Sequence, residues 1–279
     1  MNSEQRTSAA PISTDDRYER GLALLREVSG GKHEAVLGGL SDIAPDLARY
    51  TAEFAYGDLY ARPGLSYRQR QLTIVAALAA MGNAAPQLRF HIDAALNVGC
   101  TRAEIMETLI HVCVFAGFPA TLNGLTAARE VFEAAPEETS APAAPAATKD
   151  QAGDRFQRGR AALEHIDGHA GQQVIDSLKD IAPDLARYVI EFSFGDIYSR
   201  PGLDLKTREL VTVAICTALG TAGPQLRVHL HGLLNVGGSE AEAVEVITQM
   251  TAYAGFPAAL NGITAAREVF AQRSAGAQG

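Results

Sequence analysis

Residues 82–91 read GNAAPQLRFH, and residues 220–229 read GTAGPQLRVH. Each stretch opens on a glycine, which can end a helix because it adopts the left-handed backbone conformation that closes a helix C-terminus. Four residues later a proline follows, whose fixed φ angle suits the first turn of a new helix. The same helix stop, connection and helix start, closed by a histidine, therefore occurs twice and predicts two copies of one helical arrangement.

The two stretches belong to a long internal repeat. Shifting the chain by 138 residues aligns 43–132 with 181–270 without a gap, and 51 of the 90 aligned positions are identical. This period is too long for a solenoid unit and suits a duplicated small domain. We expect a first repeat with an N-terminal extension over 1–132, a linker over 133–150 and a second repeat over 151–279. The linker assignment rests on an Ala-, Pro-, Thr- and Glu-rich composition that offers little to bury.

Each repeat reads as a series of helices. Apolar helices are expected over about 66–81 and 204–219, each begun by an N-cap residue, Ser66 or Asp204. Further along, TRAE and SEAE each place glutamate three residues after threonine or serine, which is the pattern of a capping box. A last helix is expected to run through LNGxTAAREVF. Strand-like alternation is not evident, so the predicted fold is all-α, with two compact helical copies forming a pseudo-dimer.

The composition restricts the class of function. The chain has 279 residues, a net charge of −8 and 47% hydrophobic residues, with no basic cluster, so neither nucleic acid nor an anionic membrane is an expected partner. The longest apolar run, over 72–82, is shorter than the ~20 residues that a membrane-spanning helix needs. With no signal-peptide pattern, we expect a cytoplasmic protein. The three cysteines form no CxxC pair and no disulfide framework.

His91 and His229 are the first candidates for chemistry. Each lies at the edge of the apolar face of the helix that begins at PQLR. An imidazole in such a half-desolvated place can transfer protons near neutral pH, since its ordinary pKa is about 6.5. The structural alternative is a histidine at the edge of the core that bonds a backbone carbonyl. The sequence leaves both interpretations open.

Arg70 and Arg208 are candidates for substrate binding. Each lies in the first turn of an apolar helix, where a guanidinium can bind a carboxylate through two parallel hydrogen bonds. Equally, each can form an ion pair with an acidic residue of the preceding helix: Glu53 or Asp58 in the first repeat, and Glu191 or Asp196 in the second. We therefore include Glu53 and Glu191 among the candidate substrate-binding residues.

Two positions differ between the repeats in ways that bear on a site. His111 lies on one helical stripe with two glutamates, which can suggest a metal site, but the second repeat has Gln249 in its place. We therefore favour interhelical hydrogen bonding over metal binding and keep His111 as a candidate substrate-binding residue. Glu209 is matched by Gln71, so a general acid or base assigned to Glu209 exists in one repeat only.

The ordered motifs R-x-L-x-x-x-A, A[ML]G, PQLRxH, LNVG[CG][TS]xxE[IA]xE and [FY]AGFPAxLNG are similar to those of the carboxymuconolactone decarboxylase family, over about 90 residues of each repeat. This resemblance implies an all-α, alkylhydroperoxidase-like helical unit that forms oligomers. A chain with two copies would then form a homotrimer that mimics a hexamer of single-copy subunits.

One branch of this resemblance is the alkylhydroperoxidase-like group, which carries the motif C-x-x-C-x-x-x-H. With its histidine placed on His91, the two cysteines fall on Ala84 and Gln87; in the second repeat they fall on Ala222 and Gln225. Reduction of a peroxide through a dithiol needs a thiolate, which none of these residues can form. The antioxidant branch is therefore disfavoured.

The other branch resembles γ-carboxymuconolactone decarboxylase, which acts without metal or organic cofactor and releases carbon dioxide from γ-carboxymuconolactone to leave an enol-lactone. By this resemblance His91 and His229 supply the acid, and Arg70 and Arg208 hold a small carboxylate substrate. The expected function is thus a cofactor-free decarboxylase, or a related acid–base enzyme, acting on a small carboxylated lactone in aromatic degradation. The alternatives are a non-catalytic protein that binds a small carboxylate or serves in assembly, and a peroxidase-like antioxidant protein.

Overall fold

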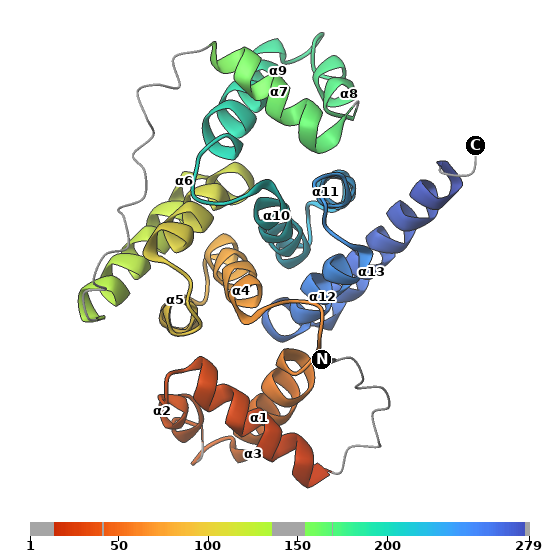
Figure 1. Cartoon of the computed structure of the whole chain (residues 1–279). Coiled ribbons are helices and arrows are strands. Elements are labelled where there is room, and N and C mark those ends of the chain that lie inside the picture. The colour runs from red at the N-terminus through yellow and green to blue at the C-terminus, as the bar shows by residue number, and fades with distance from the viewer. Residues whose placement is uncertain (1–13, 41, 136–153, 169, 277–279) are drawn as a thin grey trace, which may run out of the picture. The chain divides into compact units, whose positions relative to one another are not determined.

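The structure is a computed structural model that describes residues 14–276 apart from 41, 136–153 and 169 (Figure 1). All regular elements over these residues are helical, which confirms the all-α prediction. Most of the expected linker, 133–150, lies outside the described residues. Its first two residues, Glu133 and Ala134, are the end of a helix.

The described part of the first repeat forms seven helical elements, of which η1 is a π-helix: α1 (Thr14–Val28), α2 (His33–Gly38), α3 (Pro45–Tyr50), η1 (Thr51–Tyr60), α4 (Tyr67–Met81), α5 (Ala85–Asn97) and α6 (Arg102–Ala134). The expected helix over 66–81 is α4. Ser66 caps it through a complete capping box, and Gly82 ends it at φ 70°. In α6 the capping-box helix and the expected last helix are joined across a kink at Gly117, whose φ is 80°.

The second repeat follows the same order: α7 (Arg155–Asp167), α8 (Ala170–Asp176), α9 (Pro183–Tyr188), η2 (Val189–Tyr198), α10 (Leu205–Leu219), α11 (Gly223–Asn235), α12 (Glu240–Gln249) and α13 (Thr251–Gly276). The expected helix over 204–219 is α10, which is capped by Asp204 and ends at Gly220. Here the segment that corresponds to α6 is divided into α12 and α13, and α13 again bends at a glycine, Gly255.

The chain divides into two compact units, residues 1–63 and 64–279. This boundary differs from the one expected in the linker. The smaller unit contains α1 to η1, whereas the larger unit combines α4, α5 and α6 of the first repeat with the whole described second repeat. The repeat of the sequence and the compact units of the structure therefore do not coincide.

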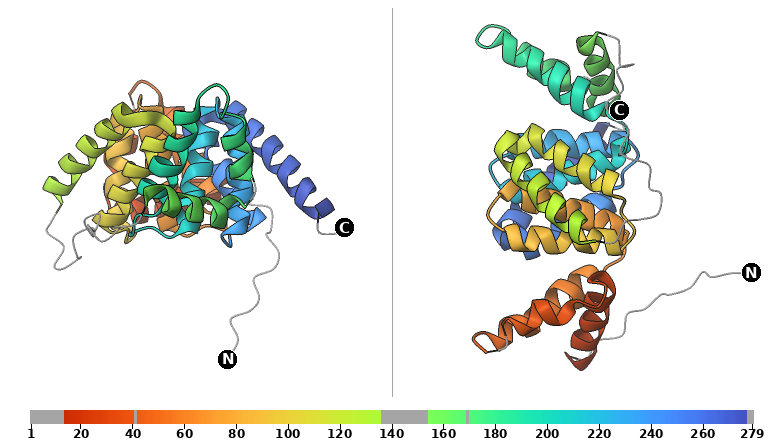
Figure 2. Two further views of the ribbon diagram at one scale, coloured as in Figure 1. Left: turned by 90° about the horizontal axis from the view of Figure 1, so that it is seen from above. Right: turned by 90° about the vertical axis from the view of Figure 1, so that its left-hand side faces the viewer.

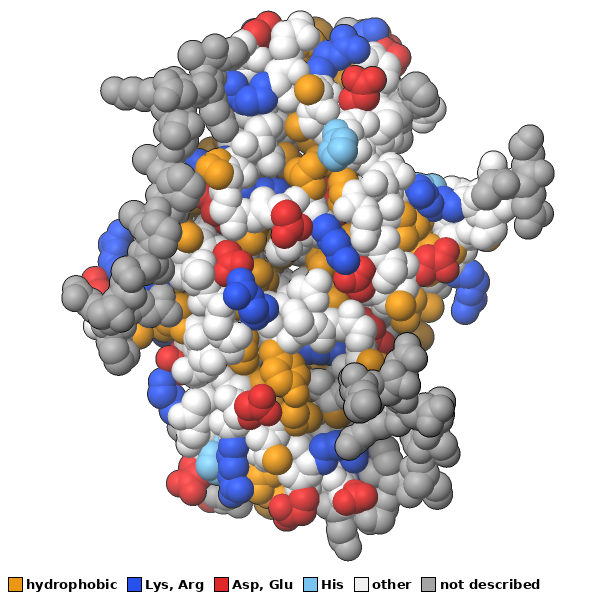
Figure 3. Space-filling model, in the orientation of Figure 1, with side chains coloured by type: hydrophobic (Ala, Val, Ile, Leu, Met, Phe, Trp, Pro, Cys, Tyr) orange, Lys and Arg blue, Asp and Glu red, His pale blue; other side chains and the backbone are white. Residues whose placement is uncertain are grey.

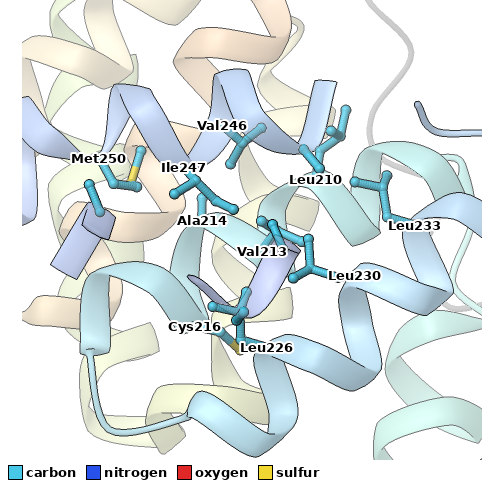
Figure 4. Close-up of a cluster of buried hydrophobic side chains, with 14 of the residues drawn as sticks. Leu210, Val213, Ala214, Cys216, Leu226, Leu230, Leu233, Val246, Ile247 and Met250 are labelled. Atoms are coloured by element: carbon cyan, nitrogen blue, oxygen red, sulfur yellow. The ribbon is translucent and has the colours of Figure 1, made fainter. Parts of the chain in front are cut away.

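The two repeats share one core inside the larger unit. Helix α4 packs along α10, and α6 also contacts α10 (Figures 1 and 2). Leu65 and Ala77 of the first repeat are buried in the same apolar cluster as Leu210, Val213 and Ala214 of the second. Figure 4 shows the part of this cluster that α10, α11 and α12 form in the second repeat. This packing gives the pseudo-dimer its physical basis, because the helices of either repeat bury their apolar faces on the other.

Helix α7 and the π-helix η2 cross at two glycines. A Cβ atom built on Gly159 would lie 2.0 Å from the carbonyl oxygen of Ile190, and one on Gly195 would lie 2.6 Å from that of Arg155. Both distances are shorter than any real contact, so only glycine permits this approach. The crossing fixes how the C-terminal ends of α7 and η2 lie in the larger unit.

By length and composition, α6 is the single described helix that can cross a membrane. Its kink at Gly117 divides it, however, and its N-terminal half packs in the shared core. This helix therefore does not indicate a membrane protein. On the face of the molecule drawn in Figure 3, basic and acidic side chains are interspersed.

Candidate active site

A cavity of about 320 Å³ lies in the larger unit, between α7, η2 and α11 of the second repeat and α6 of the first. Its walls are mainly apolar and include Val114, Phe115, Leu163, Ile166, Val189, Phe194 and Val228. Five polar side chains also line it: Asp167, Ser193, Tyr198, Gln225 and His229. Because Val114 and Phe115 come from the first repeat, this site is built by both copies.

His229 is the candidate acid of this cavity. Its side chain is almost buried, and its Nδ1 lies 2.9 Å from Oε2 of the fully buried Glu209. Burial by itself lowers the pKa of His229, but the charge and hydrogen bond of Glu209, with the charge of Asp167, outweigh burial and leave the pKa raised. With Nδ1 bonded to the carboxylate, Nε2 is the nitrogen available to a ligand in the cavity.

His91 occupies the matching place in the first repeat, but its partner is neutral. Its Nδ1 lies 2.9 Å from Oε1 of Gln71, and its ring packs edge-on against Phe90 and Tyr253. With no carboxylate to stabilise the imidazolium, burial lowers the pKa of His91 to about 3. The structure therefore separates two histidines that the sequence treats as equivalent: His91 is neutral near pH 7, whereas His229 favours its proton.

A chain of hydroxyl contacts connects the His229 site to the first repeat. The Tyr198 hydroxyl lies 3.5 Å from Nδ1 of His229 and 3.0 Å from Oγ1 of Thr212. Thr212 donates to the carbonyl of Arg208, so its oxygen accepts from Tyr198 and from His111 Nε2, which is 2.8 Å away. Burial, together with the charges of Arg208 and His229, keeps the pKa of His111 well below its ordinary value. His111 thus acts as a neutral donor between helices, and it is not among the residues that line the cavity.

Asp167 was not among the sequence candidates. It is the last residue of α7, lines the cavity and is 8% exposed. Burial and the charge of Glu209 raise the pKa of its carboxyl group to about 6, against the opposing charge of His229. The first repeat has Ser29 at the matched position. An acidic residue at a position where the other repeat has serine could have pointed to this site. The position lies outside the motifs that the two repeats share.

Arg70 and Arg208 hold the two repeats together. Each is almost wholly buried, and neither lines the cavity. Nη2 of Arg208 lies 3.0 Å from Oε2 of Glu107, and Nη2 of Arg70 lies 3.3 Å from Oε2 of Glu245, which is at the matching position of the other repeat. Arg200 also bonds Glu107, at 2.7 Å. Each arginine therefore forms a structural ion pair, as in the alternative to substrate binding, but its partner lies in the opposite repeat.

Glu53 and Glu191 form ion pairs with arginines other than Arg70 and Arg208. Glu191 lies 3.8 Å from Arg155 and does not line the cavity. Glu53 lies in the smaller unit, 3.5 Å from Arg49 and 4.0 Å from Arg17. The suggested pairing of Arg208 with Glu191 was therefore wrong, because the carboxylate of Glu107 in the other repeat occupies the buried guanidinium.

The acidic stripe of α6 does not converge on a metal site. Glu104 closes the capping box at Thr101, Glu107 bonds the arginines of the other repeat, and His111 bonds Thr212. Over the described part of the chain, no group of three or more His, Cys, Asp and Glu side chains is arranged to hold a metal ion.

The cysteines lie outside the cavity. Cys100, Cys113 and Cys216 are free and buried. Burial raises the pKa of all three thiols, to about 12 for Cys100 and Cys216. A protonated thiol is a poor nucleophile, so this arrangement does not favour thiol-dependent peroxide reduction.

These features define an all-α protein of two fused helical copies, with a histidine–carboxylate pair at a cavity between them. The chain belongs to the carboxymuconolactone decarboxylase family, whose sequence model matches residues 45–130 and, a second time, residues 183–268. The double match confirms the resemblance and the tandem duplication. His229 and Glu209 lie inside the second match, whereas Asp167 lies outside both.

The chain is also similar to individual known proteins. Over 123 residues the chain is 36% identical to 4-carboxymuconolactone decarboxylase of Acinetobacter baylyi, an alignment that covers 44% of this chain and 91% of the relative. It is 27% identical over 109 residues to a nitrosuccinic acid decarboxylase of Metarhizium robertsii, covering 39% of this chain and 76% of that one. A crystal structure of a protein assigned as a γ-carboxymuconolactone decarboxylase subunit of Burkholderia xenovorans LB400 matches with a TM-score of 0.54 at 23% identity, covering 92% of this chain and 98% of the other. This last likeness concerns the fold alone.

Proposed function

We propose that the chain is a cofactor-free decarboxylase of a small carboxylated lactone, with its acid–base site in the second repeat. The observation that carries this proposal is the 2.9 Å contact between His229 and Glu209 at the edge of a mainly apolar cavity. The similarity to two decarboxylases supports the reaction class. Three free cysteines suit the reducing cytoplasm that we propose as its location.

The cavity has the properties that loss of carbon dioxide requires. Apolar walls disfavour the localised charge of a carboxylate and favour a transition state in which that charge is spread out. Gln225 and Ser193 offer neutral hydrogen-bonding groups that can orient a lactone. Neither arginine candidate lines the cavity, so in this proposal Arg70 and Arg208 assemble the repeats and do not bind the substrate.

The reaction follows from the position of His229. As the bond to the carboxylate breaks, its electron pair passes into the unsaturated lactone as a dienolate, and carbon dioxide leaves. Nε2 of protonated His229 then donates its proton to a carbon atom of the dienolate, which gives the enol-lactone product. Glu209 stabilises the imidazolium through Nδ1 and fixes the orientation of the ring. Solvent returns the proton to His229 after each turnover.

The first repeat gives a matched control for the experiment. Carbon dioxide release from γ-carboxymuconolactone is measured for the wild type, His229→Gln and His91→Gln. Because a general acid contributes about 10²–10⁴-fold, His229→Gln should lower kcat by that factor, while His91→Gln should retain the activity. Circular dichroism checks that both variants fold.

The outcomes separate three hypotheses. If the wild type releases no carbon dioxide from γ-carboxymuconolactone or from carboxylated lactones with other ring substituents, a non-catalytic carboxylate-binding protein is the better description. Release that survives His229→Gln and is lost in His91→Gln would move the acid to the first repeat. Peroxide reduction that depends on a cysteine would favour the antioxidant alternative.

A further inference from the structure

Asp167 has an unusual place for an acidic side chain. It lines the cavity, and its Oδ1 atom is buried without a hydrogen-bond partner among the described residues. Three titratable groups from three elements face this region: His229 on α11, Glu209 on α10 and Tyr198 on η2. A carboxyl group that lines a cavity and has a buried oxygen without a hydrogen-bond partner is costly in the free protein and is suited to a ligand.

The surroundings of Asp167 favour its protonated form. Asp167 ends α7, where the helix carries partial negative charge, and the neighbouring cavity walls are apolar. Glu209 adds a negative charge, and the one cation facing the site among the described residues, His229, is already bonded to Glu209. These causes agree with a carboxyl pKa of about 6. The other acids on the elements that pack on α7 have partners of their own: Glu191 and Asp196 pair with Arg155, and Asp176 pairs with Lys179.

We propose that Asp167 binds the carboxylate of the ligand as a protonated acid, so that each bound anion brings one proton into the site. In the free protein His229 and Glu209 form a hydrogen-bonded pair, and above its pKa of about 6 Asp167 adds a negative charge beside them. The arriving carboxylate adds a second negative charge to a poorly hydrated site, and protonation of Asp167 cancels it. The Asp167 O–H then donates a hydrogen bond to the carboxylate of the ligand.

This assignment makes Asp167 the residue that recognises a carboxylate of the ligand. The class of ligand, a carboxylated lactone, rests on the proposed function, whereas the uptake of a proton on binding is argued from Asp167 itself. The matched Ser29 of the first repeat can donate a hydrogen bond but cannot take up a proton. The chain therefore suggests its own control substitution, Asp167→Ser.

The probe for the experiment is 5-oxotetrahydrofuran-2-carboxylate, a saturated lactone carboxylate that cannot form the dienolate. Isothermal titration calorimetry at about pH 7.5, in buffers of different ionisation enthalpy, measures the protons taken up with it. We expect about one proton for each bound probe in the wild type, and an affinity that falls about tenfold for each pH unit between about 6.5 and 8. Asp167→Asn keeps a hydrogen-bond donor, so it should bind with less proton uptake and a flatter pH profile. Asp167→Ser should show the same loss of uptake with a weaker affinity at pH 6.

Proton uptake that is unchanged in both variants would overturn the proposal, as would an affinity that rises with pH. Failure of the wild type to bind the probe at pH 6, where the acid form is available, would overturn it too. The decarboxylase proposal has a separate test in carbon dioxide release. If release is absent but Asp167-dependent uptake is found, the cavity is an anion site without the proposed reaction. If release is present but uptake does not depend on Asp167, the reaction stands and this role of Asp167 falls.

Discussion

The two repeats place one kind of side chain in two electrostatic environments. His91 and His229 are both buried, and each bonds through Nδ1 at 2.9 Å to the residue 20 positions earlier. The difference is one functional group: the amide of Gln71 against the carboxylate of Glu209. This group decides the direction of the pKa shift, which is downward for His91 and upward for His229.

The substitution Glu209→Gln should therefore turn the second site into a copy of the first. Without the carboxylate, burial dominates, and the pKa of His229 should move from above 6.5 to below it. Titration of the imidazole resonances by NMR measures this shift directly, and kcat at pH 7 should fall with it. The reverse change, Gln71→Glu, is the matched control and should raise the pKa of His91. An unchanged pKa of His229 in Glu209→Gln would show that Glu209 does not hold its proton.

Sequence reasoning found the histidines at this scale but not what distinguishes them. The difference between Glu209 and Gln71 is visible in the sequence, but the sequence does not show that this position contacts the histidine 20 residues later. The contact to His229 arises between α10 and α11, and helix boundaries alone do not give the rotation of one helix against another. Asp167 was missed for a related reason, since only tertiary packing brings the end of α7 to the cavity.

At the scale of elements, the position of Asp167 depends on the crossing of α7 and η2. The close approach at Gly159 leaves no room for a side chain. Asp167 lies eight residues further along α7, and Tyr198 ends η2. A change at the crossing therefore alters the far end of both elements, where the cavity begins.

Gly159→Ala should be strongly destabilising for this reason. Its Cβ would lie 2.0 Å from the Ile190 carbonyl oxygen, so α7 must move away from η2. We expect a loss of about 2–4 kcal/mol in the free energy of unfolding, beyond the usual range for an alanine substitution, together with a loss of ligand affinity. Denaturant unfolding followed by circular dichroism measures it. Gly38→Ala in α2, where a Cβ meets nothing within 4 Å, is the control and should be nearly neutral. Equal stability of the two variants would contradict a tight crossing.

The helices themselves were the most predictable elements. Their caps, glycine stops and proline starts are local signals, and Ser66, Asp204, Gly82 and Gly220 all act as expected. The π-helical form of η1 and η2 could not be predicted in the same way. It appears where a helix follows α3 or α9 without a break and packs against a neighbour at glycine, which is a tertiary circumstance.

At the scale of the whole molecule, the exposed apolar side chains are arranged by the repeat. Among the described residues the ten large ones fall into five pairs, each separated by 138 residues, and they are 52–80% exposed: Ile43 and Ile181, Leu47 and Leu185, Tyr50 and Tyr188, Phe118 and Phe256, Leu122 and Leu260. We propose that these residues are covered in a homo-oligomer, and that the oligomer is the trimer implied by the family.

Light scattering after size exclusion tests this assembly. The wild type should have about three times the 29.5 kDa mass of one chain. Leu122→Glu combined with Leu260→Glu should reduce that mass, because a charge in an apolar contact is left without hydration. A wild type that remains at the mass of one chain would reject the proposal. The tandem repeat could be predicted from the sequence, whereas the division into compact units at residue 63 could not, because it follows from the packing of α4 on α10.

The reciprocal contacts between the repeats have an evolutionary consequence. In a dimer of identical subunits every mutation falls on both sites at once, so both sites must keep what either needs. Fusion into one chain removes this constraint and lets Gln71 and Glu209 differ. The first repeat is not free to decay, however, because its Phe115 forms a wall of the cavity beside His229 and its Glu107 holds Arg208. Selection can therefore relax the chemistry of one copy while it preserves that copy as a scaffold for the other.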